Sequence, residues 1–273
     1  LLRFQRRLLW SVIKQTLLSN LIKFVMNILR SVDIKNRDQP ANASNKCAVL
    51  VPYGNRIEHE VEESLRVLES RGYAVWRVPG YSAIDQARNR MAYDALYYND
   101  FEEVMWIDAD VGFNPDDVDQ LRSYNLPICA GAYPFKGHPE LTIQLLEQDK
   151  NEDIEFGTGG YLFEIKSAAT GFLLTKKEVY EAIRKKRDLP LCNTSFDAPA
   201  YPFFWPSVFK ENGEYYYLGE DFSFCQYARD AGYKIMLDTT IKLKHIGMYG
   251  YQWEDLHYKR PERSKVKYRA FRP

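Results

Sequence analysis

The 273-residue sequence lacks several patterns that would define its class at once. Its four cysteines are scattered and form no C-x-x-C pair, which argues against a zinc site or a disulfide framework and favours a reducing compartment. Basic and acidic side chains both total 37, so the chain has no net charge. A chain without a basic surplus is not expected to bind nucleic acid. These absences predict a cytoplasmic protein whose partners are not nucleic acids.

Two glycine-rich nucleotide-binding signatures are also missing. Neither G-x-G-x-x-G nor a Walker sequence follows the first predicted strand, which ends at Pro52-Tyr53-Gly54. Without them, neither a dinucleotide-binding domain nor a P-loop NTPase is supported.

Residues 1–32 lack acidic side chains but contain six basic ones. Lys14 and Lys23 interrupt the apolar sequence, so no stretch approaches the roughly 20 residues that span a bilayer. The larger apolar residues recur at helical spacing: Trp10, Ile13, Leu17, Leu21, Phe24 and Ile28. A basic amphipathic helix of this kind is typical of a membrane interface, so we expect peripheral attachment to a membrane surface. The pattern also fits a helix packed on the domain, an oligomer contact or a transit peptide.

The remaining sequence divides into three parts. Residues 33–45 are polar and predict a linker, residues 46–253 predict one folded domain, and residues 254–273 form a basic tail. About 200 residues are enough to bury a sizeable core in one domain.

The first half of this domain alternates short apolar runs with amphipathic helical patterns. The predicted strands are 46–51, 74–78, 104–107 and 128–132, and the predicted helices are 58–71, 84–98 and one opened by Pro115. Repeated strand–helix units imply right-handed crossovers and a mostly parallel sheet flanked by helices. In the second half, residues 168–175 predict one more buried strand, whose glycine marks a close approach of a ligand or of the backbone. The sequence therefore predicts an α/β fold.

Asp108-Ala109-Asp110 follows the buried strand 104–107 directly. In α/β proteins the carboxyl edge of the sheet is where ligands bind. One or two carboxylates there typically hold Mg²⁺ or Mn²⁺, which completes its shell with water and substrate phosphates. The motif thus predicts a metal ion that binds the phosphates of a nucleotide diphosphate. The alternative is a solvated turn whose acidic side chains cap the following helix.

Further polar groups stand at comparable places in the chain. Arg88 lies near the start of a predicted helix and is suited to phosphate. Glu220 and Asp221 open another helix and offer a candidate general base, although a simple helix cap is equally consistent. His245 follows the predicted strand 241–244, where it would complete a metal shell or serve a structural role. The aromatic stretches 201–205 and 215–217 are candidates for sugar stacking, with most of their rings expected in the core.

Taken in order, these motifs resemble the nucleotide-diphospho-sugar transferase (GT-A) family of glycosyltransferases. The similarity covers about residues 46–253. It is strongest to a bacterial and viral group with an A-R-N helix, a D-A-D loop, a Y-P-F stretch and a G-E-D-F helix start. Fungal mannan polymerase subunits share part of the order. The resemblance implies a Rossmann-like GT-A fold and transfer of a sugar from a UDP- or GDP-sugar to a glycan, lipid or protein acceptor.

The resemblance also implies roles for individual residues. Asp110, Asp108 and His245 would hold Mn²⁺ or Mg²⁺. The donor would contact Pro52, Tyr53, Gly54, Arg88, Asp108 and Ala109. Asp221 would be the general base of an inverting transfer with Glu220 second, while in a retaining transfer both would position substrate. Mannan polymerase subunits assemble with one another, so an oligomer or a protein partner is consistent with the resemblance.

Two other functions remain open from sequence. A sugar nucleotidyltransferase would use a related sheet and a metal, but it normally has a glycine-rich basic loop after the first strand, and Pro52-Tyr53-Gly54-Asn55-Arg56 is a poor version. A membrane-associated GT-A pseudoenzyme or scaffold would keep the motifs without binding nucleotide.

Overall fold

The computed structural model describes residues 46–79, 83–149, 153–256 and 265–268. The chain forms two compact units, Leu1–Gln39 and Pro40–Pro273, and every described residue belongs to the second unit. The predicted amphipathic helix and the linker lie outside the described residues. Within the described ranges, no helix is both long and apolar enough to cross a membrane.

A central sheet organises the described unit, with the strand order β2-β1-β3-β10-β5-β13-β8. β2, β1 and β3 are parallel to one another, as are β5 and β13, whereas β10 and β8 run antiparallel to their neighbours. The strands are β1 (Cys47–Tyr53), β2 (Ala74–Pro79), β3 (Glu103–Ile107), β5 (Ile128–Ala130), β8 (Leu162–Ile165), β10 (Phe172–Lys176) and β13 (Ile235–Asp238). The predicted α/β fold with a mostly parallel sheet is confirmed.

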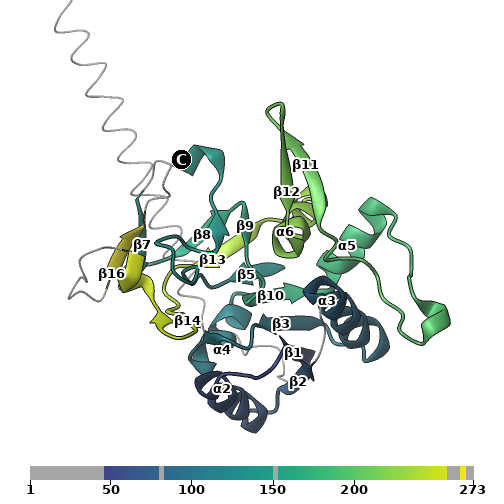
Figure 1. Cartoon of the computed structure of the whole chain (residues 1–273), viewed down its shortest axis with the longest axis horizontal. Helices are drawn as coiled ribbons and strands as arrows, with labels where there is room; N and C mark the ends of the chain where they lie inside the picture. The colour runs from purple at the N-terminus through teal and green to yellow at the C-terminus, as the bar shows by residue number, and fades with distance from the viewer. Residues whose placement is uncertain (1–45, 80–82, 150–152, 257–264, 269–273) are drawn as a thin grey trace, which may run out of the picture. The chain divides into compact units, whose positions relative to one another are not determined.

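Helices cover both faces of this sheet (Figure 1). One core cluster includes side chains of α2 (His59–Ser70) and α4 (Pro115–Ser123), and the other includes side chains of α3 (Ile84–Tyr93), α5 (Lys177–Arg187) and α6 (Glu220–Asp230). Strands covered on both faces are apolar throughout rather than alternating, which is why β1 and β3 appear as continuous apolar runs.

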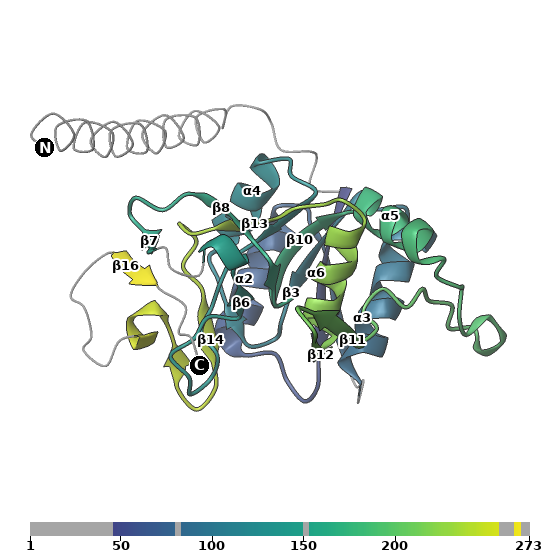
Figure 2. The same ribbon diagram turned by 90° about the horizontal axis from the view of Figure 1, so that it is seen from above.

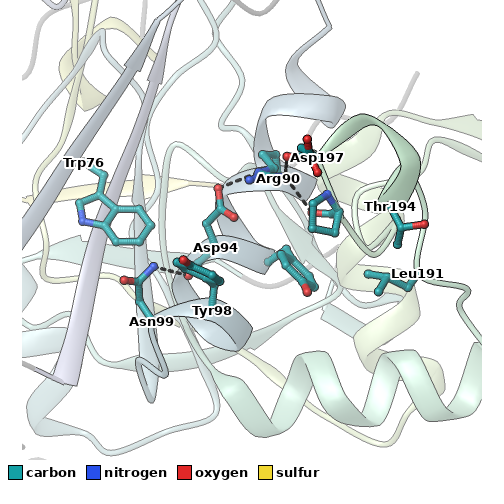
Figure 3. A pocket seen from close by; sticks show the side chains of 10 residues that line it. Trp76, Arg90, Asp94, Tyr98, Asn99, Leu191, Thr194 and Asp197 are labelled. Atoms are coloured by element: carbon teal, nitrogen blue, oxygen red, sulfur yellow. Dashed lines mark hydrogen bonds and ion pairs between the residues drawn. The ribbon is translucent and has the colours of Figure 1, made fainter.

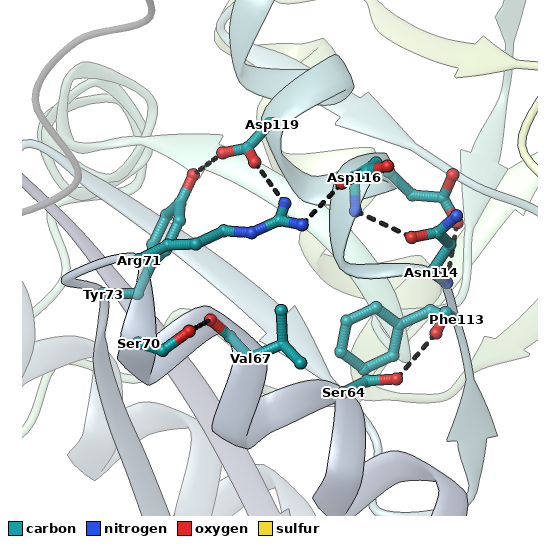
Figure 4. A network of polar contacts seen from close by, with 10 residues as sticks. Ser64, Val67, Ser70, Arg71, Tyr73, Phe113, Asn114, Asp116 and Asp119 are labelled. Atoms are coloured by element: carbon teal, nitrogen blue, oxygen red, sulfur yellow. Dashed lines mark hydrogen bonds and ion pairs between the residues drawn. The ribbon is translucent and has the colours of Figure 1, made fainter.

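Polar contacts hold the start of α4, which follows the Asp108–Asp110 loop in the chain, in place (Figure 4). Asn114 caps this helix by accepting a hydrogen bond from the amide of Asp116 at 3.1 Å, and Pro115 occupies the first turn, as the sequence predicts. Arg71, at the end of α2, donates to Asp119 at 2.7 Å and to Asp116 at 2.6 Å. The two helices on this face are therefore tied to each other and to the loop.

Three predicted elements differ from the structure. The helix predicted over 84–98 is α-helical to Tyr93 and continues as a π-helix, η2 (Asp94–Tyr98). The strand predicted over 168–175 is split, because β9 (Ser167–Ala168) pairs with β6 (Ile143–Gln144) in a separate sheet while β10 pairs with β3 and β5 in the main sheet. The strand predicted over 241–244 forms instead as β14 (Lys244–Ile246), since that register pairs with β4 (Val111–Gly112).

Smaller elements surround the main sheet. β14 also pairs with β15 (Gly250–Tyr251), and β6 (Ile143–Gln144) pairs with β9. β7 (Ile154–Gly157) pairs with β16 (Lys265–Tyr268), which lies within the basic C-terminal stretch. Figure 2 shows the hairpin of β11 (Ser207–Glu211) and β12 (Glu214–Leu218) beside α6. The short helices are η3 (Glu147–Asp149), η4 (Thr194–Phe196) and η5 (Trp253–Leu256).

Candidate functional site

A cavity of about 600 Å³ lies at the carboxyl ends of β1 and β3. Its walls come from the end of β1, the first turns of α3, the loop after β3 and the start of α6. The sequence-predicted residues that line it are Pro52, Tyr53, Gly54, Arg88, Asp108, Ala109, Asp110, Glu220 and Asp221. His245 does not line it but contacts Asp110. The fold thus brings the predicted residues together from segments far apart in the sequence.

Arg88 is the cation at the centre of this cavity wall, and only 2% of its side chain is exposed. Its Nη2 donates to Asp108 Oδ1 at 2.9 Å, while its Nε lies 3.6 Å from Asp221 Oδ1 and 3.8 Å from Glu220 Oε1. Burial lowers the pKa of Arg88, but these three carboxylates raise it by more, so the guanidinium stays charged. Its Nε and Nη1 have no hydrogen-bond partner among the described residues, which leaves buried donors at the cavity wall.

Asp108 accepts a hydrogen bond from Arg88, and its side chain lies close to the backbone at Gly171. Burial raises the pKa of Asp108, and the effect of Arg88 opposes that rise. A Cβ added to Gly171 would lie 2.8 Å from Asp108 Oδ2 and 2.1 Å from the hydroxyl oxygen of Tyr133. Glycine is therefore required at position 171, where the sequence predicts a close approach, and the neighbours are side chains of the site.

Asp110 lies in a different environment, among cationic and ring nitrogen atoms. Lys136 Nζ donates to Asp110 Oδ2, and His245 Nε2 lies 3.7 Å from the same oxygen. Burial raises the pKa of Asp110, but His245 and Lys136 lower it by more, so the net shift is downward. β14 positions His245 here, since His245 pairs with Val111, the residue after Asp110.

The pair of Asp110 and His245 fits a divalent cation. Nδ1 of His245 lies 2.9 Å from the carbonyl oxygen of Pro134, so Nδ1 donates there, and Nε2, on the side of Asp110, is the nitrogen that would bind a cation. Metal-binding histidines use this arrangement, in which the second ring nitrogen donates to a carbonyl. Within the described ranges, no group of three His, Cys, Asp or Glu side chains is placed to hold a metal, and Asp108 is paired with Arg88. Substrate phosphates and water would supply the other ligands.

Glu220 and Asp221 begin α6, and the carboxylates of both lie beside Arg88. Burial and the neighbouring Asp221 raise the pKa of Glu220 to about 7. Asp221 accepts a hydrogen bond from Thr170, which follows β9. Near neutral pH Glu220 therefore gains and loses its proton readily, next to a second carboxylate. Such a pair is suited to proton exchange with a substrate hydroxyl.

Three site residues were not found from sequence. Tyr133 packs its ring edge-on to His245 at 5.0 Å, and burial raises its pKa well above the ordinary value, with Asp108 adding to the rise. Lys136 and Thr170 contact Asp110 and Asp221. Tyr133 and Lys136 lie in a segment without strand or helix periodicity, whereas Thr170 lies in the predicted strand 168–175. All three reach the site through tertiary packing, so no local pattern marks their contacts.

Arg90, the residue after the A-R-N segment of residues 87–89, lies outside this cavity. It donates to Asp94 at 2.8 Å and to the carbonyl oxygen of Asp197 at 3.2 Å, beside a separate cavity of about 740 Å³ (Figure 3). Arg90 therefore anchors the segment after α5 to α3, while Arg88 is aimed at the carboxylates.

Comparisons with known proteins give no match among family models and none among curated sequences. Among solved structures, the chain is similar to A197 from STIV, at 13% identity and a TM-score of 0.47, over 74% of this chain and 85% of that chain. It is also similar to GalNAc-T7 solved with UDP, GalNAc and Mn²⁺, at 13% identity and a TM-score of 0.42, over 74% of this chain and 43% of that chain.

A third similar structure is an apo UDP-glucose pyrophosphorylase, at 13% identity and a TM-score of 0.34, over 80% of this chain and 81% of that chain. Because the identities and TM-scores are low, the function proposed below rests on the geometry of the site in this chain.

Proposed function

We propose that this chain is a glycosyltransferase of the GT-A type, which moves a sugar from a nucleotide-diphosphate donor to a hydroxyl of a glycan, lipid or protein acceptor. The observation that carries the proposal is the cavity at the carboxyl edge of the sheet. It joins a buried arginine with two unpartnered donors, the Asp108–Asp110 loop and the Glu220–Asp221 pair. A diphosphate needs cationic donors, and an acceptor hydroxyl needs a carboxylate. This cavity offers both.

The donor would bind across the end of β1 and the start of α3. Pro52, Tyr53 and Gly54 would contact the nucleotide base, and Ala109 and Asp108 would contact the ribose. Nη1 of Arg88, which has no hydrogen-bond partner in the described part of the chain, would donate to a diphosphate oxygen and so relieve an otherwise costly buried polar group. UDP- and GDP-sugars are the donor classes that the resemblance implies.

Asp110 and His245 would hold Mn²⁺ or Mg²⁺, with Asp108 next to them. Such an ion supplies Lewis-acid stabilisation of the leaving diphosphate, worth several kcal/mol. Lys136 donates to the Asp110 oxygen that lies nearest His245 Nε2, so the lysine and the ion would compete for this carboxylate.

The transfer forms one bond and breaks another. The acceptor oxygen bonds to the anomeric carbon while the bond from that carbon to the diphosphate oxygen breaks, and the nucleoside diphosphate leaves with the electron pair. In an inverting reaction Asp221, oriented by Thr170, takes the acceptor proton, with Glu220 second. In a retaining reaction the proton goes to the departing phosphate, and both carboxylates position the acceptor.

The remaining expectations concern the context of the enzyme. We propose that the basic helix of residues 1–32 places it peripherally on the cytoplasmic side of a membrane, near a lipid or glycan acceptor. Self-association or a protein partner is consistent with that location.

Thermal unfolding with a nucleotide panel tests this function. The chain is melted with UDP, GDP, CMP or dTDP compounds, each with and without Mn²⁺, because a ligand of the folded state raises the midpoint. We expect one nucleotide to raise the midpoint and to do so only with Mn²⁺. If every nucleotide leaves it unchanged, the transferase proposal fails and a pseudoenzyme or scaffold is favoured.

A sugar nucleotidyltransferase is separated from this proposal by its product, since it would release pyrophosphate from a nucleoside triphosphate and a sugar phosphate. The loop after β1 does not favour it. Arg56, its basic residue, donates to Glu58 at 3.0 Å.

A further inference from the structure

A further cavity, of about 700 Å³, borders the same helix as the candidate site and is distinct from the cavity beside Trp76 and Asp94. It is called the second cavity from here on. Ile84, Ala87 and Arg88 of α3 face the candidate site, whereas Asp85, Gln86, Asn89 and Arg90 face the second cavity. These two sets lie on opposite sides of the helix, as expected from about 100° of rotation per residue. The first turns of α3 therefore border both cavities, one on each side of the helix.

Two exposed aromatic side chains border the second cavity. Trp205 is 63% exposed and Tyr217 is 77% exposed, although their neighbours Phe203 and Phe204 are fully buried. Large aromatic surfaces left in water beside a cavity are typical of a binding site. Tyr215, on the same hairpin, is 72% exposed but does not border the cavity, and its ring faces Lys210.

The aromatic wall is held in place by hydrogen bonds to rigid elements. Ser223 of α6 accepts from the amide of Ser207 at 3.1 Å and donates to the carbonyl oxygen of Leu218 at 3.2 Å, which fixes both strands of the hairpin. Asn89 Oδ1 accepts from the amide of Phe204 at 2.7 Å, which fixes the residue before Trp205. The cavity is thus preorganised, which lowers the entropy cost of binding.

Polar side chains complete the cavity opposite the aromatic wall. Within the described part of the chain, the Asp85 carboxylate and the Gln86 amide make no side-chain hydrogen bond, and both line the cavity. Aromatic faces combined with planar hydrogen-bonding groups match a sugar ring, which has an apolar C–H face and a rim of hydroxyls. A nucleotide phosphate fits less well, because the carboxylate of Asp85 would repel it.

The second cavity lies within reach of the candidate catalytic pair. Tyr217 precedes Glu220 by three residues, so their Cα atoms are at most about 11 Å apart. A short oligosaccharide spans such a distance.

We propose that the second cavity binds the acceptor, and that the acceptor is an oligosaccharide. Its terminal sugar presents a hydroxyl to Glu220 and Asp221, while preceding sugars stack on Tyr217 and Trp205. The assignment of Glu220 and Asp221 in this proposal rests on the proposed function, whereas the binding of an oligosaccharide to the cavity can be measured separately.

The test measures binding of the full chain to an array of immobilised oligosaccharides, two to six sugars long, with monosaccharides included. Trp205→Ala and Tyr217→Ala are compared with Tyr215→Ala, the matched exposed variant outside the cavity. We expect the wild type to bind a set of related oligosaccharides and each cavity variant to bind them about three- to tenfold more weakly. Tyr215→Ala should bind like the wild type. Melting curves confirm that each variant folds.

Nucleotide-dependent melting of the same proteins separates this proposal from the proposed function. If the wild type and both cavity variants bind the array equally, the acceptor-site proposal is overturned. It is also overturned if the wild type binds a nucleotide but no oligosaccharide. If oligosaccharide binding depends on Trp205 and Tyr217 while no nucleotide shifts the midpoint, the glycan site stands and the transferase proposal fails.

Discussion

Arg88 of α3 and Asp108 at the end of β3 form a buried ion pair, with Nη2 and Oδ1 2.9 Å apart. The same guanidinium faces Glu220 and Asp221 of α6, so one cation balances three carboxylates from three elements. Removing one partner of a buried pair is costly because the charge left behind has no compensation. The pair therefore makes the stability of the fold depend on the same groups that form the candidate site.

Substitution of Arg88 should destabilise the chain in a pH-dependent way. Arg88→Met is expected to lower the free energy of unfolding by about 3 kcal/mol near pH 8, because three carboxylates lose their counter-charge. Arg88 lowers the pKa values of Asp108 and Glu220, so both pKa values rise in the variant, and the penalty should shrink as the pH falls and these two carboxylates become protonated. Urea unfolding at about pH 8 and about pH 5 measures both effects. Arg66→Met, at an exposed pair with Glu62, is the control and should cost less than about 1 kcal/mol.

Glu220→Gln should stabilise the fold at neutral and higher pH. The pKa of Glu220 rises from 4.5 to about 7 on folding, so the folded state disfavours its charge. The resulting penalty is absent below the unfolded pKa, grows as the pH rises between the two values and is complete above the folded one. The variant should gain roughly 1–3 kcal/mol near pH 8 and almost nothing near pH 4. A gain of equal size at both pH values would contradict this assignment.

Gly171→Ala adds only a methyl group but should lower both the stability of the fold and the affinity for nucleotide. The added Cβ would lie 2.1 Å from the hydroxyl of Tyr133 and 2.8 Å from Asp108 Oδ2, so both side chains must move. Overpacking of this kind typically costs about 1–3 kcal/mol. Thermal unfolding measures the loss, and nucleotide binding should fall with it. Gly54→Ala meets no atom within 4 Å of the added Cβ and serves as the control for the unfolding measurement alone, because Gly54 lines the candidate site.

Lys136→Met should strengthen binding of Mn²⁺ in the absence of nucleotide. Lys136 binds the Asp110 oxygen that the ion would use, so the lysine competes with the ion for that carboxylate. The expected readout is a larger rise in melting midpoint on addition of Mn²⁺ for the variant than for the wild type. An equal or smaller rise would show that Lys136 does not compete with the ion.

Much of the sheet was predictable because its strands are buried on both faces. β1 and β3 are continuous apolar runs, and each is followed by a helical pattern with clear start or stop signals such as Pro115 and Gly72. That alternation also places the Asp108–Asp110 loop at the carboxyl edge, next to Gly54 and Arg88. Motif order alone therefore located most of the cavity wall.

The rest depends on tertiary contacts that local sequence does not encode. His245 lies within β14 rather than after a strand, because pairing with Val111 decides the register. Tyr133 and Lys136 follow β5 in an irregular segment, and their roles arise only when β14 and the Asp110 loop pack beside them. The second cavity likewise requires α3 and the β11–β12 hairpin to meet, although they are far apart in the chain.

The most direct test of the central claim is release of nucleoside diphosphate from UDP- and GDP-sugars by the full chain with Mn²⁺, compared with Asp110→Ala. The account predicts metal-dependent release by the wild type with one donor, loss of at least about a hundredfold in the variant, and closely similar melting midpoints for the two proteins. Full activity in Asp110→Ala, or no release from any donor by the wild type, would contradict it.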